Sequence, residues 1–255
     1  WERFRGSRYH VLGNHDMDTC DKSEAMAFWG MPRNYYSYDC GAYHFVVLDA
    51  NYLYLDGRYV DYRNGNYHQW PEAVNNLPPE QLRWLRDDLA ATDKQTLIFC
   101  HSSLESHLVG TNLGIHQHDE FREIVREANR NAKFQKVAAC LYGHLHLDGV
   151  KVIDDVYYIH INSMSYYYLG KNYQAVRYSE EITASHRLLS QVAPYQDALY
   201  AIVKLEPGLL SIDGRESAFL EPSPLALGHP NEKAGHVLAP KISTRRLPLL
   251  TGKRD

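Results

Sequence analysis

Three short strings of residues in this sequence carry side chains that could bind metal ions. They are Gly13-Asn14-His15-Asp16, Cys100-His101-Ser102 and Gly143-His144-Leu145-His146. They supply an amide and several imidazoles, which are ligands that divalent transition metals accept. Each string follows an apolar run typical of a strand, and open α/β sheets place their sites in loops at the carboxyl ends of strands. The three strings together therefore predict one metal site built from residues that are distant in the sequence.

Each string also has an ordinary structural explanation when it is taken alone. Asn-His after a strand is common turn chemistry, and a single histidine such as His101 is more often hydrogen-bonded than bound to a metal. The pair His144 and His146 can bind ions only if the turn directs the two imidazoles apart. The metal interpretation depends on the order of all three strings and on their shared position after strands.

The pattern of apolar residues predicts the helices and strands that would position these strings. Asp21 and Glu24 have the spacing of a capping box at the start of a helix. The predicted helices cover residues 21–29, 79–91 and 119–131, and the predicted strands cover 9–12, 35–39, 43–49, 95–100, 137–142, 150–153, 156–161, 199–205 and 209–212. Alternating strands and helices followed by paired strands indicate an α/β sandwich.

The composition is that of an ordinary globular protein. The 255 residues are 44% hydrophobic and 23% charged, with a net charge of -4. A nucleic-acid polymer is therefore not the expected partner, because such partners usually need a basic face. No apolar run approaches the roughly 20 residues that span a bilayer. The four cysteines follow no metal-binding spacing, and a disulfide between Cys20 and Cys40 is one alternative for an exported protein.

The polar, aromatic residues 51–76 have the composition of one long loop, and residues 52–70 within it are the best candidate for a loop that faces the substrate. Long ordered loops are often functional. Arg63 could meet a phosphate oxygen, and Tyr67 could stack on a base. Tyr166, which lies after the last histidine string, could also line the pocket. The alternative is that these tyrosines only pack the loop against the surface.

The three strings, in this order, resemble the calcineurin-like metallophosphoesterase superfamily. The family pattern ends in Gly-Asn-His-Asp or Glu, a strand-end His and Gly-His-x-His, and residues 13–16, 101 and 143–146 match these elements. The resemblance covers residues 9–212 and implies an α/β sandwich of two mixed β-sheets packed face to face and flanked by helices, in four layers. It predicts a metallophosphoesterase domain over residues 1–217 and an irregular, Pro-rich tail over 218–255.

The resemblance implies a centre with two divalent metal ions, drawn from Mn, Fe, Zn or Ni. Asn14, His101 and His144 would bind one ion, and His146 would bind the other. A water molecule activated by the two ions would attack the phosphorus of the substrate. The implied activity is the hydrolysis of a phosphoric ester.

The resemblance also assigns the two residues that follow Asn14. His15 would contact the phosphate and act as the general acid that protonates the leaving oxygen. Asp16 would orient His15 and stabilise its charge, as a carboxylate beside an imidazole can.

Two elements of the family pattern, Asp-x-His and Gly-Asp-x-x-Asp, have no match in this sequence. In the family they supply further ligands and the carboxylate that both ions share. One explanation is that they precede Trp1 in a longer protein, because a fold that began in mid-sheet would expose a strand edge. The other is that the chain is a binding or structural module without catalysis. The first explanation favours an exported protein.

Within the superfamily the strings and the helix over 79–91 look similar to enzymes that act on small molecules, such as the ADP-ribose/CDP-alcohol diphosphatase-like and cyclic-nucleotide phosphodiesterase-like groups. The expected substrate is a small phosphorylated or nucleotide-like molecule, cleaved at a phosphodiester or diphosphate bond. A phosphomonoesterase of the same fold is the near alternative. A DNA-processing nuclease shares the pattern, but the acidic charge balance counts against it. The oligomeric state is left open.

Overall fold

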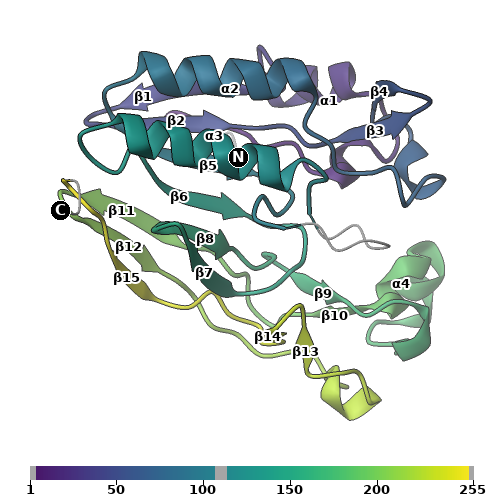
Figure 1. Cartoon of the computed structure of the whole chain (residues 1–255). Coiled ribbons are helices and arrows are strands. Elements are labelled where there is room, and N and C mark those ends of the chain that lie inside the picture. Colours follow the sequence, from purple (N-terminus) through teal and green to yellow (C-terminus); the bar gives the residue numbers. More distant parts are fainter. Residues whose placement is uncertain (1–3, 107–113, 253–255) are drawn as a thin grey trace. The chain divides into compact units, whose positions relative to one another are not determined.

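A computed structural model of the chain describes residues 4–106 and 114–252 (Figure 1). The chain has the mixed α/β fold that its sequence predicts, and it divides into two compact units. The first unit contains the described residues up to 144 together with 152–158 and 252, and the second contains 145–151 and 159–251. Within residues 4–106 and 114–252, none of the helices has the length and apolar character of a membrane span.

Helices and strands alternate along the first unit. Its elements are η1 (Asn14–Met17), α1 (Lys22–Trp29), β1 (Tyr36–Cys40), β2 (Tyr43–Val47), β3 (Tyr52–Leu55), β4 (Arg58–Asp61), η2 (Asn66–His68), α2 (Pro79–Ala91), β5 (Gln95–Cys100), α3 (His118–Asn131) and β6 (Val137–Tyr142). Two further strands, β7 (Gly149–Ile153) and β8 (Val156–His160), have residues in both units.

A six-stranded mixed sheet in the order β1-β2-β5-β6-β8-β7 organises these elements. Strands β1 and β2 form an antiparallel hairpin, and β2, β5 and β6 run parallel. Strands of a parallel sheet are buried on both faces, and β6 is buried at every position. The carboxyl ends of β5 and β6 are followed directly by His101 and by Gly143 and His144.

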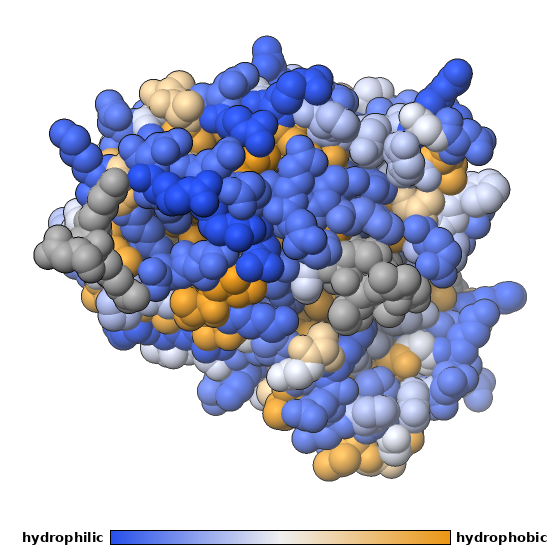
Figure 2. Space-filling model, in the orientation of Figure 1, coloured by the Kyte–Doolittle hydropathy of each residue, from blue (hydrophilic) through white to orange (hydrophobic). Residues whose placement is uncertain are grey.

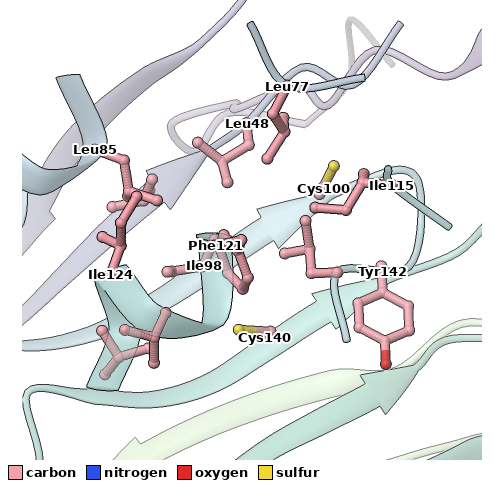
Figure 3. Close-up of a cluster of buried hydrophobic side chains, with 14 of the residues drawn as sticks. Leu48, Leu77, Leu85, Ile98, Cys100, Ile115, Phe121, Ile124, Cys140 and Tyr142 are labelled. Atoms are coloured by element: carbon pink, nitrogen blue, oxygen red, sulfur yellow. The ribbon is translucent and has the colours of Figure 1, made fainter. Parts of the chain in front are cut away.

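Helices α2 and α3 lie side by side along this sheet (Figure 1). Their apolar residues enter one core, in which Leu85, Phe121 and Ile124 pack with Ile98 and Cys140 of the central strands (Figure 3). Hydrophilic residues cover most of the face seen in Figure 2, in the view of Figure 1. The buried apolar residues recur at the helical spacing of the sequence, as Leu82, Leu85 and Leu89 in α2 and as Phe121, Ile124 and Val125 in α3.

A second apolar cluster joins η1, α1 and the β3–β4 hairpin. Its buried members are Leu12, Met17, Ala25, Met31, Leu53, Tyr62, Tyr67 and Val74. Helix α1 begins with the predicted capping box, in which the carboxylate of Asp21 accepts from the backbone N–H of Glu24 and the carboxylate of Glu24 accepts from that of Asp21. The turn η1 therefore packs, through Met17, against buried residues of α1 and of the β3–β4 hairpin.

An ion network around the buried Lys22 and Asp49 holds the segment that leads into η1. The Nζ of Lys22 lies 2.7 Å from a carboxylate oxygen of Asp49 and 2.7 Å from one of Asp61. Asp49 is fully buried and also accepts a hydrogen bond from the amide of Asn51. The same amide donates to the carbonyl of Leu12 at 2.8 Å, so the network fixes the backbone immediately before Gly13.

Residues 9–12, which the sequence predicts as a strand, belong to no strand of the described structure. Side chains take the place of a neighbouring strand. The backbone N–H of His10 donates to the hydroxyl of Tyr36, and the carbonyl of Leu12 accepts from Asn51. This run of four residues thus has the sequence pattern of a strand, although side chains rather than a neighbouring strand bond to the backbone of His10 and Leu12.

Two further expectations are corrected. The stretch 51–76 is not one long loop, because Tyr52–Leu55 and Arg58–Asp61 form an antiparallel hairpin around a turn with Asp56 and Gly57 at positive φ. Cys20 and Cys40 are both free thiols, so the alternative of a disulfide between them is wrong.

The second unit contains several small sheets. Its elements are β9 (Tyr166–Tyr168), η3 (Lys171–Tyr173), α4 (Glu180–Ser185), η4 (Arg187–Gln191), β10 (Val192–Pro194), β11 (Ile202–Glu206), β12 (Leu209–Asp213), η5 (Leu225–Leu227), β13 (Glu232–Lys233), β14 (His236–Val237) and β15 (Arg245–Pro248). Strands β11, β12 and β15 form a three-stranded antiparallel sheet.

The tail expected to be irregular over 218–255 contributes a strand to this sheet. Leu247 of β15 pairs opposite the fully buried Leu210 of β12, and Arg246 forms an ion pair with Asp213 at 2.9 Å. These cross-strand partners are distant in sequence, which is why the periodicity of the tail alone does not reveal the strand. A domain boundary at residue 217 and the face-to-face packing of two sheets stay predictions.

Candidate active site

Asn14, His101 and His144 come together in the first unit from three separate connections. The Nε2 of His101 lies 3.0 Å from the Oδ1 of Asn14 and 3.1 Å from the Nδ1 of His144. Nitrogen and oxygen ligands bind a metal ion at roughly 2.0–2.2 Å, so two neighbouring ligands at a right angle lie about 3 Å apart. Both distances from His101 Nε2 match the spacing of neighbouring ligands that share one ion.

Strands β5 and β6 position the two imidazoles. The parallel ladder brings the strand ends together, and the backbone N–H of Gly143 donates to the carbonyl of His101 at 3.1 Å. Gly13 lets Asn14 lie close to His101, because a Cβ atom at position 13 would lie 3.0 Å from the Cε1 of the His101 ring. Glycine is required here for a close contact rather than for an unusual backbone conformation, since the φ of Gly13 is -97°.

His144 has a left-handed backbone, with a φ of +60°. A residue other than glycine pays roughly 1–2 kcal/mol for this conformation, although histidine adopts it more often than most. Such backbones persist where the surrounding structure determines them, and they gather at functional sites. The conformation is therefore consistent with a residue whose side chain direction matters.

The second unit contains His146 and Tyr166, and their rings meet edge to face with centroids 4.9 Å apart. His146 also has a left-handed backbone, with a φ of +55°. These two predicted site residues therefore lie together within the second unit.

The donor set of the first unit suits a divalent transition metal. Two imidazoles and one amide are neutral, so they offset none of the charge of an ion. In the part of the chain that the structure describes, no group of three or more His, Cys, Asp or Glu side chains is arranged to hold a metal. The three donors thus fit one ion, and they lack the carboxylates that the family pattern supplies.

His15 stands on the same 3₁₀ turn as Asn14 and exposes 64% of its side chain. Its Nδ1 lies 2.9 Å from the Oδ2 of Asp18 and 3.1 Å from the hydroxyl of Tyr67. That hydroxyl donates to the other carboxylate oxygen of Asp18. One nitrogen of an exposed ring is therefore held by two polar groups.

The carboxylate of Asp16 does not orient His15, although the family resemblance implies that it would. Its carboxylate accepts from the backbone N–H of Gly13 at 2.7 Å and from the indole N–H of Trp29 at 3.4 Å. In a 3₁₀ helix side chains three residues apart lie one above the other, whereas consecutive residues do not face each other. Asp18 therefore takes the place beside His15, and Asp16 closes the turn.

Arg63 and Tyr67 have different surroundings. Arg63 is exposed and forms a backbone bridge with Asp21. Tyr67 is only 6% exposed and stacks on Tyr62 with ring centroids 4.9 Å apart. Burial is the largest cause that raises the pKa of Tyr67, and the hydrogen bond with Asp18 is the next largest. The structure thus places Tyr67 beneath His15 and leaves little of its ring for a substrate base.

Cys100, although it precedes His101, has no chemical part in this arrangement. Its thiol is 3% exposed, and burial raises its pKa to about 12. A thiolate is the form that binds metals and attacks electrophiles. Cys100 therefore acts as a small apolar side chain of the core.

The comparison with family models decides what kind of protein carries this arrangement. Residues 2–148 match the model of the calcineurin-like phosphoesterases. The chain belongs to the calcineurin-like phosphoesterase family. The matched region contains the three histidine strings at 13–16, 101 and 143–146, and it confirms the resemblance seen in the sequence.

Two known proteins are similar to this phosphoesterase chain. A manganese-dependent ADP-ribose/CDP-alcohol diphosphatase of Oryza sativa subsp. japonica is 27% identical over 184 residues, which are 60% of this chain and 56% of the relative. The chain thus spans about half the length of this curated relative. The crystal structure of a dimetal phosphatase from Danio rerio covers 84% of this chain and 72% of its own, with 17% identity and a TM-score of 0.52. This likeness confirms the fold.

Proposed function

We propose that this chain belongs to an enzyme that hydrolyses a phosphodiester or diphosphate bond of a small, nucleotide-like molecule with divalent metal ions. The observation that carries the proposal is the convergence of Asn14 Oδ1, His101 Nε2 and His144 Nδ1 within 3.0 and 3.1 Å. Membership of the phosphoesterase family supports the reaction class. The diphosphatase relative, named as manganese-dependent, supports the bond and the metal.

Three residues of the first unit would hold one ion. They are Asn14, His101 and His144, for which the donor spacing is favourable. His146 is assigned to a second ion by the family pattern alone. Bound divalent ions supply positive charge for the phosphate and lower the pKa of a water that attacks it. For this chain to turn over substrate by itself, carboxylates other than those of the unmatched family elements would have to complete the set of ligands.

His15 would carry the proton transfer. Its exposed ring, on the turn that also presents Asn14, can approach a phosphate held at the site. When the bond between phosphorus and the leaving oxygen breaks, the electron pair of that bond stays on the oxygen, which takes a proton from His15. Arg63, exposed in the neighbouring connection, is the proposed contact for a further phosphate oxygen.

A substrate comparison tests the proposed function. The 255-residue chain, with its mass verified, is assayed in Mn²⁺ and in EDTA with bis-p-nitrophenyl phosphate, p-nitrophenyl phosphate and ADP-ribose. We expect metal-dependent turnover of the diester and of ADP-ribose, with the monoester slower. Faster turnover of the monoester would make the protein a phosphomonoesterase. No turnover of any of the three would contradict catalysis by this chain and favour a binding module.

Single substitutions separate the ligands from the proton donor. His101→Ala and His144→Ala are expected to lose bound Mn²⁺. His15→Ala is expected to keep Mn²⁺ and to lower kcat by roughly 10²- to 10⁴-fold, the usual contribution of a general acid. His186→Ala, at an exposed position in the second unit, is the matched control. Unchanged Mn²⁺ content in His144→Ala would overturn the ligand assignment.

A further inference from the structure

Building on the proposed function, we propose that Asp18 and Tyr67 are positioning residues that hold His15 with its Nε2 directed to the leaving oxygen. Nothing in the sequence patterns that identify the family points to either residue in this role. The inference comes from the contacts around the imidazole, and it deepens the account of the same site.

The contacts determine which nitrogen of His15 carries a proton. An ionised carboxylate can only accept hydrogen bonds, and Asp18 accepts from Nδ1 of His15 at 2.9 Å. Nδ1 therefore bears a proton in the neutral ring as well as in the charged ring. Nε2 is left as the nitrogen that changes its protonation state during the reaction.

Tyr67 connects this exposed pair to the interior. Its ring is buried in the apolar cluster with Met17 and Tyr62, while its hydroxyl reaches the Nδ1 of His15 at 3.1 Å and donates to Asp18. An exposed imidazole would otherwise move between rotamers. The buried tyrosine gives both partners a fixed point, and positioning of a reacting group is a major part of catalysis.

The proton transfer balances with these assignments. The phosphorus–oxygen bond to the leaving group breaks as a bond to the oxygen of water forms, and the leaving oxygen takes the proton from Nε2. One proton of the water goes to solvent, and the other stays on the phosphoryl product. His15 is left as the neutral ring, whose Nδ1–H still donates to Asp18, and solvent returns a proton to Nε2. Asp18 stays ionised throughout.

A series of leaving groups tests the role of Asp18. Two phosphodiesters that share the transferred phosphoryl group carry either p-nitrophenol or phenol as the leaving group. Phenolate leaves poorly without a proton, so Asp18→Asn should lower kcat for the phenyl ester by roughly 10²-fold. The loss for the p-nitrophenyl ester should be less than about tenfold. A purely structural fault would lower both rates equally, and that result would overturn the proposal.

Matched variants sharpen the comparison. Tyr67→Phe removes only the hydroxyl and is expected to give the same pattern with a smaller loss for the phenyl ester. Asp119→Asn removes an exposed carboxylate on α3 and controls for the lost charge. Equal behaviour of Asp18→Asn and Asp119→Asn across both esters would also overturn the proposal.

A second readout is independent of activity. In the metal-free chain with ¹⁵N-labelled histidine, nitrogen shifts report the tautomer of His15 at about pH 8.5, where histidine is normally neutral. The signals of His15 are identified as those missing from the spectrum of His15→Gln. We expect the Nδ1–H tautomer in the unsubstituted chain and its loss in Asp18→Asn. Finding the Nε2–H tautomer in the unsubstituted chain overturns the positioning role. The Nδ1–H tautomer in a chain without phosphodiester turnover would support that role and contradict the proposed function.

Discussion

His101 Nε2 and Asn14 Oδ1 lie 3.0 Å apart although 87 positions separate the two residues. Their approach needs the parallel pairing of β2, β5 and β6 and the network that fixes the chain before Gly13. No local segment can bring the two atoms together. The donor set therefore exists only in the folded chain.

Metal binding should for this reason stabilise the native state. A ligand present at 100 times its Kd adds about 2.7 kcal/mol when it binds only the folded protein. We expect Mn²⁺ to raise the free energy of unfolding of the chain by this order, measured by urea titration with and without the metal. In His101→Ala the difference between the two titrations should vanish. An equal gain in that variant would show binding elsewhere.

Gly13→Ala should weaken the metal site with little effect on the fold. The new Cβ would lie 3.0 Å from the Cε1 of His101, while the backbone of Gly13 is already extended and suits alanine. The ring must shift by a few tenths of an ångström, and we expect a loss of roughly tenfold in Mn²⁺ affinity. Calorimetric titration measures it, with Gly252→Ala, where a Cβ meets nothing within 4 Å, as the control.

Lys22 and Asp49 should show strong energetic coupling. Their charged atoms are 2.7 Å apart and their side chains are 6% and 0% exposed. Removing one partner of a buried pair costs about 3–5 kcal/mol, because the other charge stays buried. Lys22→Met should therefore lower the free energy of unfolding by about 3 kcal/mol. The double variant Lys22→Met, Asp49→Leu should lose less than the sum of the single losses, and strict additivity would contradict the coupling.

His44 gives the stability a dependence on pH. Its Nδ1 lies 2.7 Å from Asp39 and its Nε2 lies 2.9 Å from Asp88, so only the charged ring can donate to both. The hydrogen bond with Asp88, the largest cause, raises the pKa of His44 above its usual 6.5 although burial opposes it.

The sign of the effect follows from the raised pKa. The folded chain holds the His44 proton more tightly, so its stabilising contribution is complete below pH 6.5, the unfolded value, and is lost as the pH rises through the folded pKa. The free energy of unfolding should fall between these values more steeply in the natural chain than in His44→Gln. Parallel pH profiles of the two proteins would contradict this.

The cysteines should differ in reactivity. Cys40 is exposed, whereas Cys100 and Cys140 are buried. Burial raises the pKa of the Cys100 thiol to about 12, and the thiolate is the reactive form. Iodoacetamide should label Cys40 in the native protein and reach Cys100 and Cys140 only in denaturant, as peptide mass mapping would record. Native labelling of Cys100 would contradict the packing around β5.

Local patterns predict the regular elements well. The helix over 79–91 matches α2 at both ends because two prolines precede its apolar stripe, and the capping box at Asp21 marks the start of α1. The strands before His101 and Gly143 are found because both are buried, apolar and of strand length. The approach of His101 and His144 follows from these strand ends, whereas Asn14 follows no strand of the described structure and depends on the contact of Asn51 with Leu12.

Non-local contacts explain what the sequence does not reveal. Residues 9–12 form no strand, and the side chains of Tyr36 and Asn51 hydrogen-bond to the backbone of His10 and Leu12 instead. Asp18 does not stand out in the sequence, because the 3₁₀ turn over Asn14–Met17, which places it beside His15, has no signal of its own in the residue pattern. The burial of Tyr67 depends on a hairpin that the polar composition of 51–76 conceals.

The contacts of Asp18 and Tyr67 with Nδ1 of His15 also determine which nitrogen of this histidine reacts with electrophiles. With Nδ1 engaged and most of the side chain in solvent, an acylating reagent such as diethyl pyrocarbonate has Nε2 of His15 as its point of attack. The adduct would lie on the atom proposed to serve the substrate. A plot of the remaining activity against the fraction of acylated His15 would give the proportion of molecules in a preparation that are catalytically active.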